Sequence, residues 1–162
     1  LQLLQLQKRC FARVHTFGKA CGVHGAIVLG SDDLRNYLIN FSRPFVYSTS
    51  LPEASIAAIK SSYQIFPTLF KEREHLTSLI QHFHNLQPVT HNTQTPIQVV
   101  IIPGNQKVKK VANELQENNL DVRPILYPTV PKGSERLRIV LHSFNTIDEV
   151  NKLTGILSAN SF

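Results

Sequence analysis

The sequence Thr16-Phe-Gly-Lys-Ala-Cys-Gly-Val-His-Gly25 forms a glycine-rich bend between two segments, within residues 11–29, that we expect to be strands. Glycine allows backbone conformations that other residues avoid and lets another group approach closely. Lys19 stands in this bend between Gly18 and Ala20. A lysine flanked by small residues between two strands is held where a ligand can approach it. The spacing alone is also compatible with a purely structural alternative, in which Lys19 lies at a strand end and simply keeps its ammonium group in water.

A group of hydroxyls, Tyr47-Ser48-Thr49-Ser50, precedes a helix that we expect to begin at Pro52. Hydroxyls and free backbone N–H groups at a helix N-terminus suit an anion such as phosphate. Simple N-capping by one of these hydroxyls is the alternative.

Two arginines lie in a predicted strand over residues 136–141. Apolar residues alternate along it, so Arg136 and Arg138 both point away from the core face. Such an arginine can bind a carboxylate with two hydrogen bonds, or it can simply be exposed. Alternation does not choose between the two. Thr129 lies on a stiff, proline-bounded connection before this strand.

From residue 97 onward the pattern predicts the order strand, helix, strand, strand, helix. We expect strands over residues 97–102, 122–126 and 136–141, a helix capped by Asn105, and a last helix opened by the capping box Thr146-Ile-Asp-Glu149. Residues 89–162 are thus predicted to form a small α/β domain. Residues 1–66 resemble the end of another domain, and residues 67–88 a connecting helix.

The composition excludes several classes of protein and partner. The chain has 162 residues, a formal net charge of +6 and 42% hydrophobic residues, which excludes a disordered chain, a collagen and a coiled coil. The longest apolar runs, such as Val99–Ile102, are too short to cross a bilayer. Basic residues are scattered, so we expect no nucleic-acid partner.

Two cysteines make no disulfide framework, which favours a reducing compartment, the cytoplasm. His75, His82, His84 and His91 lack the spacing of metal ligands, so no metal is expected.

Three segments, in this order, resemble the α-oxoamine synthases, pyridoxal 5′-phosphate (PLP) enzymes of the aspartate aminotransferase fold. They are residues 16–25, Phe41-Ser-Arg-Pro-Phe-Val-Tyr-Ser-Thr-Ser-Leu-Pro52 and Tyr127-Pro-Thr-Val-Pro-Lys-Gly-Ser-Glu-Arg-Leu-Arg138. The resemblance covers nearly the whole chain. It implies an α/β fold, namely the C-terminal part of a fold-type I PLP-dependent transferase: the end of the large-domain sheet plus a small α+β domain.

The resemblance also implies roles around the cofactor. Lys19 would form the Schiff base with PLP, and Thr16 would contact the cofactor phosphate. Ser48 and Thr49 would reach the phosphate of the neighbouring subunit's cofactor, so the active site would belong to a homodimer.

The substrates follow from the same resemblance. Arg138 would hold the amino-acid carboxylate, which settles the choice against Arg136, and Thr129 would contact the substrate nearby. The implied substrates are L-alanine and an acyl thioester, with no membrane partner. Other members of the family use glycine or serine, and a non-catalytic interaction module is a further alternative.

The amino-terminal half of that family has no counterpart in these residues. We therefore expect a fragment that is not a competent synthase alone. Residues 1–66 are expected to expose apolar surface that a missing sheet would cover.

Overall fold

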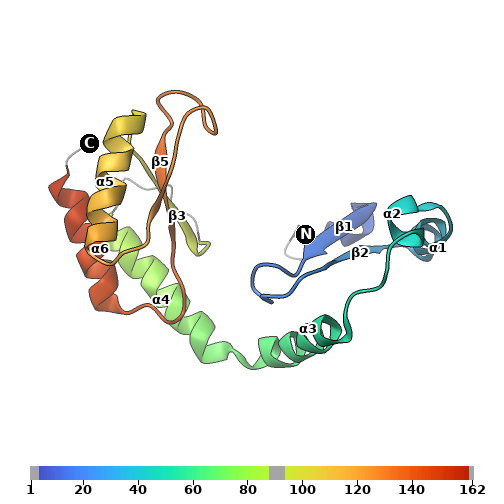
Figure 1. The fold of residues 1–162 in the computed structure, drawn as a ribbon. Helices are drawn as coiled ribbons and strands as arrows, with labels where there is room; N and C mark the ends of the chain where they lie inside the picture. Colours follow the sequence, from blue (N-terminus) through green and yellow to red (C-terminus); the bar gives the residue numbers. More distant parts are fainter. Residues whose placement is uncertain (1–3, 88–93, 161–162) are drawn as a thin grey trace. The chain divides into compact units, whose positions relative to one another are not determined.

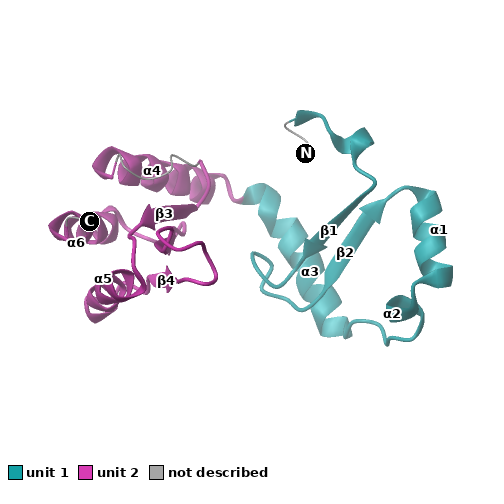
Figure 2. Ribbon diagram, turned by 90° about the horizontal axis from the view of Figure 1, so that it is seen from above, with its two compact units in different colours: residues 1–68 teal, residues 69–162 magenta. Residues whose placement is uncertain are grey.

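The computed structural model describes residues 4–87 and 94–160. The chain divides into two compact units, Leu1–Thr68 and Leu69–Phe162 (Figure 2). Each unit is considered by itself.

The first unit is built on a two-stranded antiparallel sheet. Strand β1 (Ala12–Thr16) pairs with β2 (Ala26–Gly30), with Thr16 opposite Ala26. The helices of this unit follow β2 along the chain (Figure 1); they are α1 (Asp32–Phe41), α2 (Arg43–Val46) and α3 (Glu53–Ile65), and short 3-10 turns occupy Gln7–Arg9 and Phe66–Thr68. The one-turn helix α2 lies directly before the hydroxyl-bearing residues 47–50.

Apolar side chains of the first unit are mostly exposed. Among its described residues only Phe17, at 6% exposure, is buried. Val14 is 65% exposed on β1, and Phe41 is 68% exposed on α1. The prediction that this part of the chain exposes apolar surface is confirmed. Surface of this kind is normally covered by another part of a protein or by a partner.

The second unit is a three-stranded antiparallel sheet with helices on one face. The strand order is β3 (Ile97–Ile101), β5 (Arg136–Val140) and β4 (Arg123–Ile125). The helices are α4 (Phe70–Leu86), α5 (Asn105–Glu117) and α6 (Ile147–Ala159), and α4 packs on α6 (Figure 2). Along β5, Leu137 and Ile139 are buried whereas Arg138 is exposed. The predicted alternation and the predicted order of elements are confirmed.

The core of the second unit joins all three helices to the inner face of the sheet. Removing this much apolar surface from water is the main stabilising term for such a small unit. The buried hydrophobic side chains are Leu79, Ile80, Phe83, Val100, Ile102, Val108, Val111, Ala112, Leu115, Val122, Leu137, Ile139, Leu141, Val150, Leu153 and Leu157.

Two predicted helix starts have different outcomes. The capping box of α6 is confirmed: the backbone N–H of Glu149 donates to Thr146 Oγ1 at 3.2 Å, and the N–H of Thr146 donates to Glu149 Oε2 at 2.9 Å. The predicted cap of α5 is wrong. Gly104, with φ +98°, is the N-cap, and Asn105 is the first residue of the helix. The Asn105 side chain binds the backbone of Tyr127 instead.

The capping box should respond differently to its two substitutions. Hydrogen bonds from the Thr146 N–H and the Asn145 amide hold the pKa of Glu149 below its ordinary value of 4.5. The stabilisation from this carboxylate is therefore present above pH 4.5 and lost as the pH falls through the lower folded-state pKa. Thr146→Ala should lower the free energy of unfolding by about 1 kcal/mol at pH 7. Glu149→Gln should also destabilise at pH 7, but its difference from the wild type should shrink below pH 4.5.

Urea unfolding of the protein encoded by the complete reading frame, at pH 7 and at acid pH, measures the effect of each substitution on the free energy of unfolding. Glu117→Gln, at the exposed end of α5, is the matched control, since Glu117 takes part in no helix cap. A Glu149→Gln effect that is the same at all pH values would contradict the assignment.

Candidate functional site

The bend that carries Lys19 continues the hydrogen-bond ladder of β1 and β2. The N–H of Phe17 donates to Gly25 O at 2.9 Å, and the N–H of Val23 donates to Phe17 O at 3.0 Å. The N–H of Gly22 closes a tight turn on Lys19 O at 2.9 Å. Gly22 and Gly25 have φ values of +61° and +130°, which L side chains rarely adopt. The bend is thus an ordered turn in which backbone groups bind one another.

The base of the bend is fixed by side-chain packing. The ring of Phe17 meets Tyr63 on α3 edge-on, with centroids 6.4 Å apart. A Cβ added at Gly25 would lie 2.9 Å from Leu51 Cδ1 and 3.4 Å from the Phe17 ring. Close packing at Gly25 therefore holds the bend against the segment that leads into α3.

The bend presents an amine beside a hydroxyl. Lys19 Nζ donates to Thr16 Oγ1 at 3.3 Å, and both side chains are exposed. Within residues 4–87 and 94–160, no carboxylate forms an ion pair with Lys19. A primary amine can condense with an aldehyde, and a hydroxyl can donate to a phosphate oxygen. This donor set fits PLP, which carries both an aldehyde and a phosphate.

The hydroxyls of Ser48 and Thr49 lie in the exposed segment between α2 and α3. The N-cap of α3 is Pro52, and no side chain caps this helix. The alternative that one of the hydroxyls at residues 47–50 serves as an N-cap is therefore wrong. Both residues are exposed.

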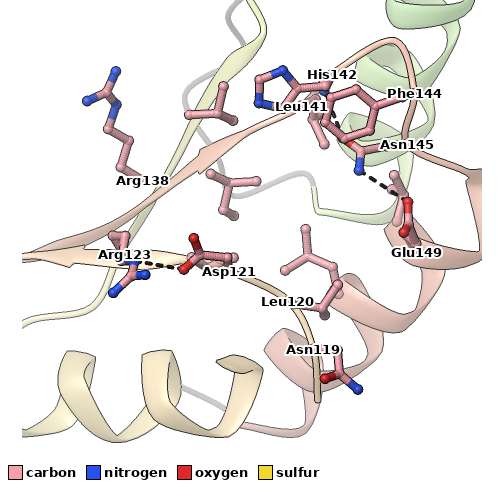
Figure 3. Close-up of a pocket in the computed structure, with 15 residues that line it drawn as sticks. Asn119, Leu120, Asp121, Arg123, Arg138, Leu141, His142, Phe144, Asn145 and Glu149 are labelled. Atoms are coloured by element: carbon pink, nitrogen blue, oxygen red, sulfur yellow. Dashed lines mark hydrogen bonds and ion pairs between the residues drawn. The ribbon is translucent and has the colours of Figure 1, made fainter. Parts of the chain in front are cut away.

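The structure distinguishes the two candidate arginines in the second unit. Arg136 Nε donates to Ser134 O at 2.8 Å and is half-buried. Arg138 is exposed and lines a cavity of about 550 Å³. Arg123, which lies directly opposite Arg138 in the sheet, is bound to Asp121 at 2.7 Å. Figure 3 shows the Arg138 guanidinium extending away from this ion pair. Arg138 therefore lines the cavity and takes no part in the ion pair between Arg123 and Asp121.

The far end of this cavity is a polar turn that the sequence reasoning did not include. The rings of His142 and Phe144 stack at 4.8 Å with an interplanar angle of 7°. Asn145 accepts from the N–H of His142 at 2.8 Å and donates to Glu149 Oε2 at 3.1 Å (Figure 3). The capping box was the one sequence signal for this turn, because it marks where α6 begins.

Thr129 lies on the exposed loop between β4 and β5, and both ends of this loop are bound by side chains. Asn105 accepts from the N–H of Tyr127 at 3.0 Å and donates to its carbonyl at 3.2 Å. Glu135, 2% exposed, accepts from the N–H groups of Gly104 and Gly133. These bonds, that of Gly104 first, hold the pKa of Glu135 below 4.5. Sequence reasoning gave Asn105 only as a helix cap and did not single out Glu135.

The histidines of α4 bind separate protein groups. His82 Nε2 lies 2.7 Å from Asn151 Oδ1, and His84 Nε2 lies 2.8 Å from Gln98 Oε1. His75 Nε2 lies 2.9 Å from Asn145 O, and His91 is outside the described residues. In the part of the chain that is described, no three His, Cys, Asp or Glu side chains are grouped to hold a metal ion. In the same part, none of the helices has the length and apolar character needed to cross a bilayer.

Comparison with known proteins identifies the family. The model of the family "Aminotransferase class I and II" matches residues 4–153. The chain therefore belongs to this family. A curated relative from Emericella nidulans, 8-amino-7-oxononanoate synthase, is 40% identical over 163 residues, covering 94% of this chain and 40% of its own length.

Solved structures agree with the fold. The crystal structure of 8-amino-7-oxononanoate synthase from Francisella tularensis is 28% identical with a TM-score of 0.84, and the match covers 94% of this chain and 46% of that chain. A structure of SPT with PLP has a TM-score of 0.85 at 21% identity, covering 97% of this chain and 41% of its own, and it supports the fold alone. The resemblance to α-oxoamine synthases and the predicted fold class are confirmed. The chain spans about 40% of the length of the curated relatives it matches.

Gly25→Ala should destabilise the bend. Residues other than glycine are strained at φ +130°, and the new Cβ would press on Leu51 and Phe17. We expect a loss of about 1–3 kcal/mol in the free energy of unfolding. Gly18→Ala is the matched control in the same bend, because nothing lies within 4 Å of its Cβ position. Urea unfolding of the protein as encoded measures both variants, and equal losses would refute the role given to Gly25.

Proposed function

We propose that this chain carries the cofactor lysine and the substrate arginine of an 8-amino-7-oxononanoate synthase. The net reaction joins L-alanine to pimeloyl-CoA, or to a pimeloyl carrier protein, in biotin biosynthesis. A bond forms between Cα of alanine and the thioester carbonyl carbon, the thiol leaves, and the alanine carboxylate is lost as CO₂. The observation that carries the proposal is the amine of Lys19 held beside the hydroxyl of Thr16 at the end of a hydrogen-bonded bend.

Four residues of the first unit would hold PLP. The amine of Lys19 is the point of covalent attachment, and the hydroxyl of Thr16 donates to the phosphate. Ser48 and Thr49 serve the phosphate in the neighbouring subunit of a homodimer, which their exposed position allows. When bound, PLP supplies a ring that accepts the electron pair left on Cα as its proton departs.

Lys19 has a second task once the amino acid has taken its place. Its free amine accepts the Cα proton of alanine, which requires the neutral form. Within the described residues no carboxylate forms an ion pair with Lys19. The hydroxyl of Thr16 can accept from the ammonium or donate to the amine, so it keeps Nζ in place in either state.

Arg138 would bind and orient the substrate. A guanidinium binds a carboxylate with two parallel hydrogen bonds, which fixes the direction of the Cα–H bond as well as the position of the molecule. Thr129 would contact the substrate from the β4–β5 loop. Arg136 is less suited to this task, because its Nε is already bound to Ser134 O.

Other amino acids are alternative substrates. Glycine or serine would present the same carboxylate to Arg138, so this residue does not select the side chain of the amino acid. The names and identities of the curated relatives favour alanine and a pimeloyl thioester. Comparing turnover of alanine, glycine and serine with one acyl-CoA would decide among these members of the family.

Lys19→Ala should abolish covalent PLP binding. The protein as its reading frame encodes it, including any residues before Leu1, should acquire the visible absorbance of lysine-bound PLP. Borohydride reduction and peptide mapping should then find the label at Lys19. Lys60→Ala on the exposed side of α3 is the control and should keep the band. A wild-type protein that stays colourless with added PLP would favour a non-catalytic module.

Arg138→Ala should raise the KM for alanine by about 10- to 100-fold, because a charge-assisted contact to the carboxylate is lost. Arg123→Gln is the comparison, since the Arg123 guanidinium already binds Asp121. Steady-state kinetics with varied alanine at saturating thioester makes the measurement. Equal effects of the two substitutions would remove the basis for assigning the carboxylate to Arg138.

A further inference from the structure

We propose that Asn105 and Glu135 are positioning residues that clamp the β4–β5 loop in a conformation ready to bind substrate. The loop comprises residues 126–135 and joins two neighbouring strands of the second unit. The structural part of the proposal stands on the hydrogen bonds of this unit alone. The substrate part rests on the proposed function, in which Thr129 contacts the substrate.

The first clamp holds the beginning of the loop. Asn105 Oδ1 accepts from the N–H of Tyr127 at 3.0 Å, and Asn105 Nδ2 donates to the carbonyl of the same residue at 3.2 Å. One side-chain amide thus satisfies both backbone groups of one residue. Two opposed hydrogen bonds fix the orientation of the backbone at Tyr127, which a single bond would leave free to rotate. Thr129 follows two residues later.

The second clamp holds the end of the loop. Glu135 Oε2 accepts from the N–H of Gly104 at 3.0 Å and from the N–H of Gly133 at 2.9 Å. The backbone of Glu135 is bound as well, because its carbonyl accepts from the N–H of Ile102 at 2.8 Å. The side chain is 2% exposed, and burying a carboxylate is tolerated only where donors surround it. Such charge-assisted bonds are stronger than bonds between neutral groups.

Both clamps meet at one place, the start of α5. Asn105 is the first residue of this helix, and Gly104 is its N-cap. Gly104 and Gly133 have φ values of +98° and +85°, conformations that glycine adopts without strain. The two ends of the loop are therefore tied to neighbouring residues of a rigid helix whose inner face is buried.

Two local backbone hydrogen bonds support the loop between the clamps. The N–H of Val130 donates to Leu126 O at 3.2 Å, and the N–H of Ser134 donates to Pro131 O at 2.9 Å. Thr129 and Lys132 are exposed. A loop of this kind without end clamps would sample many conformations, and binding would then carry the free-energy cost of ordering it. The clamps remove that cost before substrate arrives, so their loss should raise KM more than it lowers kcat.

Limited trypsin digestion reads the order of the loop without any activity. The bond after Lys132 contains the N–H of Gly133, which the second clamp binds, and the exposed side chain of Lys132 can enter a protease once the loop opens. In the protein as encoded, Asn105→Ala should increase cleavage after Lys132 by about 10-fold. Asn113→Ala is the matched control, an exposed asparagine on the same helix that does not bind the loop, and it should leave cleavage unchanged.

Glu135 provides a second variant with a conservative partner. Glu135→Ala removes the acceptor, whereas Glu135→Gln keeps one oxygen that can accept from both glycine N–H groups. Cleavage after Lys132 should increase in the order wild type, Glu135→Gln, Glu135→Ala. Thermal unfolding of each variant identifies global destabilisation. If Glu135→Ala does not fold, the Asn105→Ala result still decides the proposal.

Steady-state kinetics completes the test. Asn105→Ala should raise the substrate KM by about 10-fold while kcat stays within about threefold. Cleavage that is unchanged in Asn105→Ala refutes the clamp, whatever the turnover. Increased cleavage with an unchanged KM, or a loss confined to kcat, refutes its role in substrate binding. Absence of wild-type turnover refutes the proposed function instead, and the cleavage rates then judge the clamp separately.

Discussion

The hydrogen-bond ladder between β1 and β2, continued by the bond from Phe17 to Gly25, is the constraint on which the candidate site depends. A lysine in an unsupported loop would pass through many positions, and few of them would bring its amine beside a given hydroxyl. The ladder instead fixes the backbone on both sides of Lys19. Gly22 and Gly25, both with positive φ, turn the chain sharply in this bend, where the amine of Lys19 lies beside the hydroxyl of Thr16. The chemistry proposed for this amine requires such placement, because both attachment and proton transfer depend on distance.

Features decided within a few residues could be predicted from the sequence. The alternation in β5, the capping box of α6 and the strand–bend–strand around Lys19 follow from side chains that interact with near neighbours. The larger fold could not be derived in this way. A two-stranded sheet with exposed apolar faces does not define an architecture, and it was the resemblance of three ordered segments that indicated the aminotransferase fold.

Contacts between distant residues account for what the sequence did not show. Alternation could not separate Arg136 from Arg138, since Arg138 lines a cavity formed by residues far apart in the sequence, whereas Arg136 binds its near neighbour Ser134. Asn105 matched the pattern of a helix cap, but its partner is a backbone 22 residues away. Glu135 stood between a serine and an arginine with no local signal, and its main partner, Gly104, is 31 residues away. Pairings of this kind become visible only when the strands and helices are in place.

The two-ended attachment of the β4–β5 loop has a consequence for how this family can vary. Because both ends are tied to adjacent residues of one helix, the number of residues between the attachments is set by the span they must bridge. An insertion there would detach one end or force the backbone outward. Changes in chain length among homologous proteins should therefore accumulate in surface segments other than the one that carries Thr129.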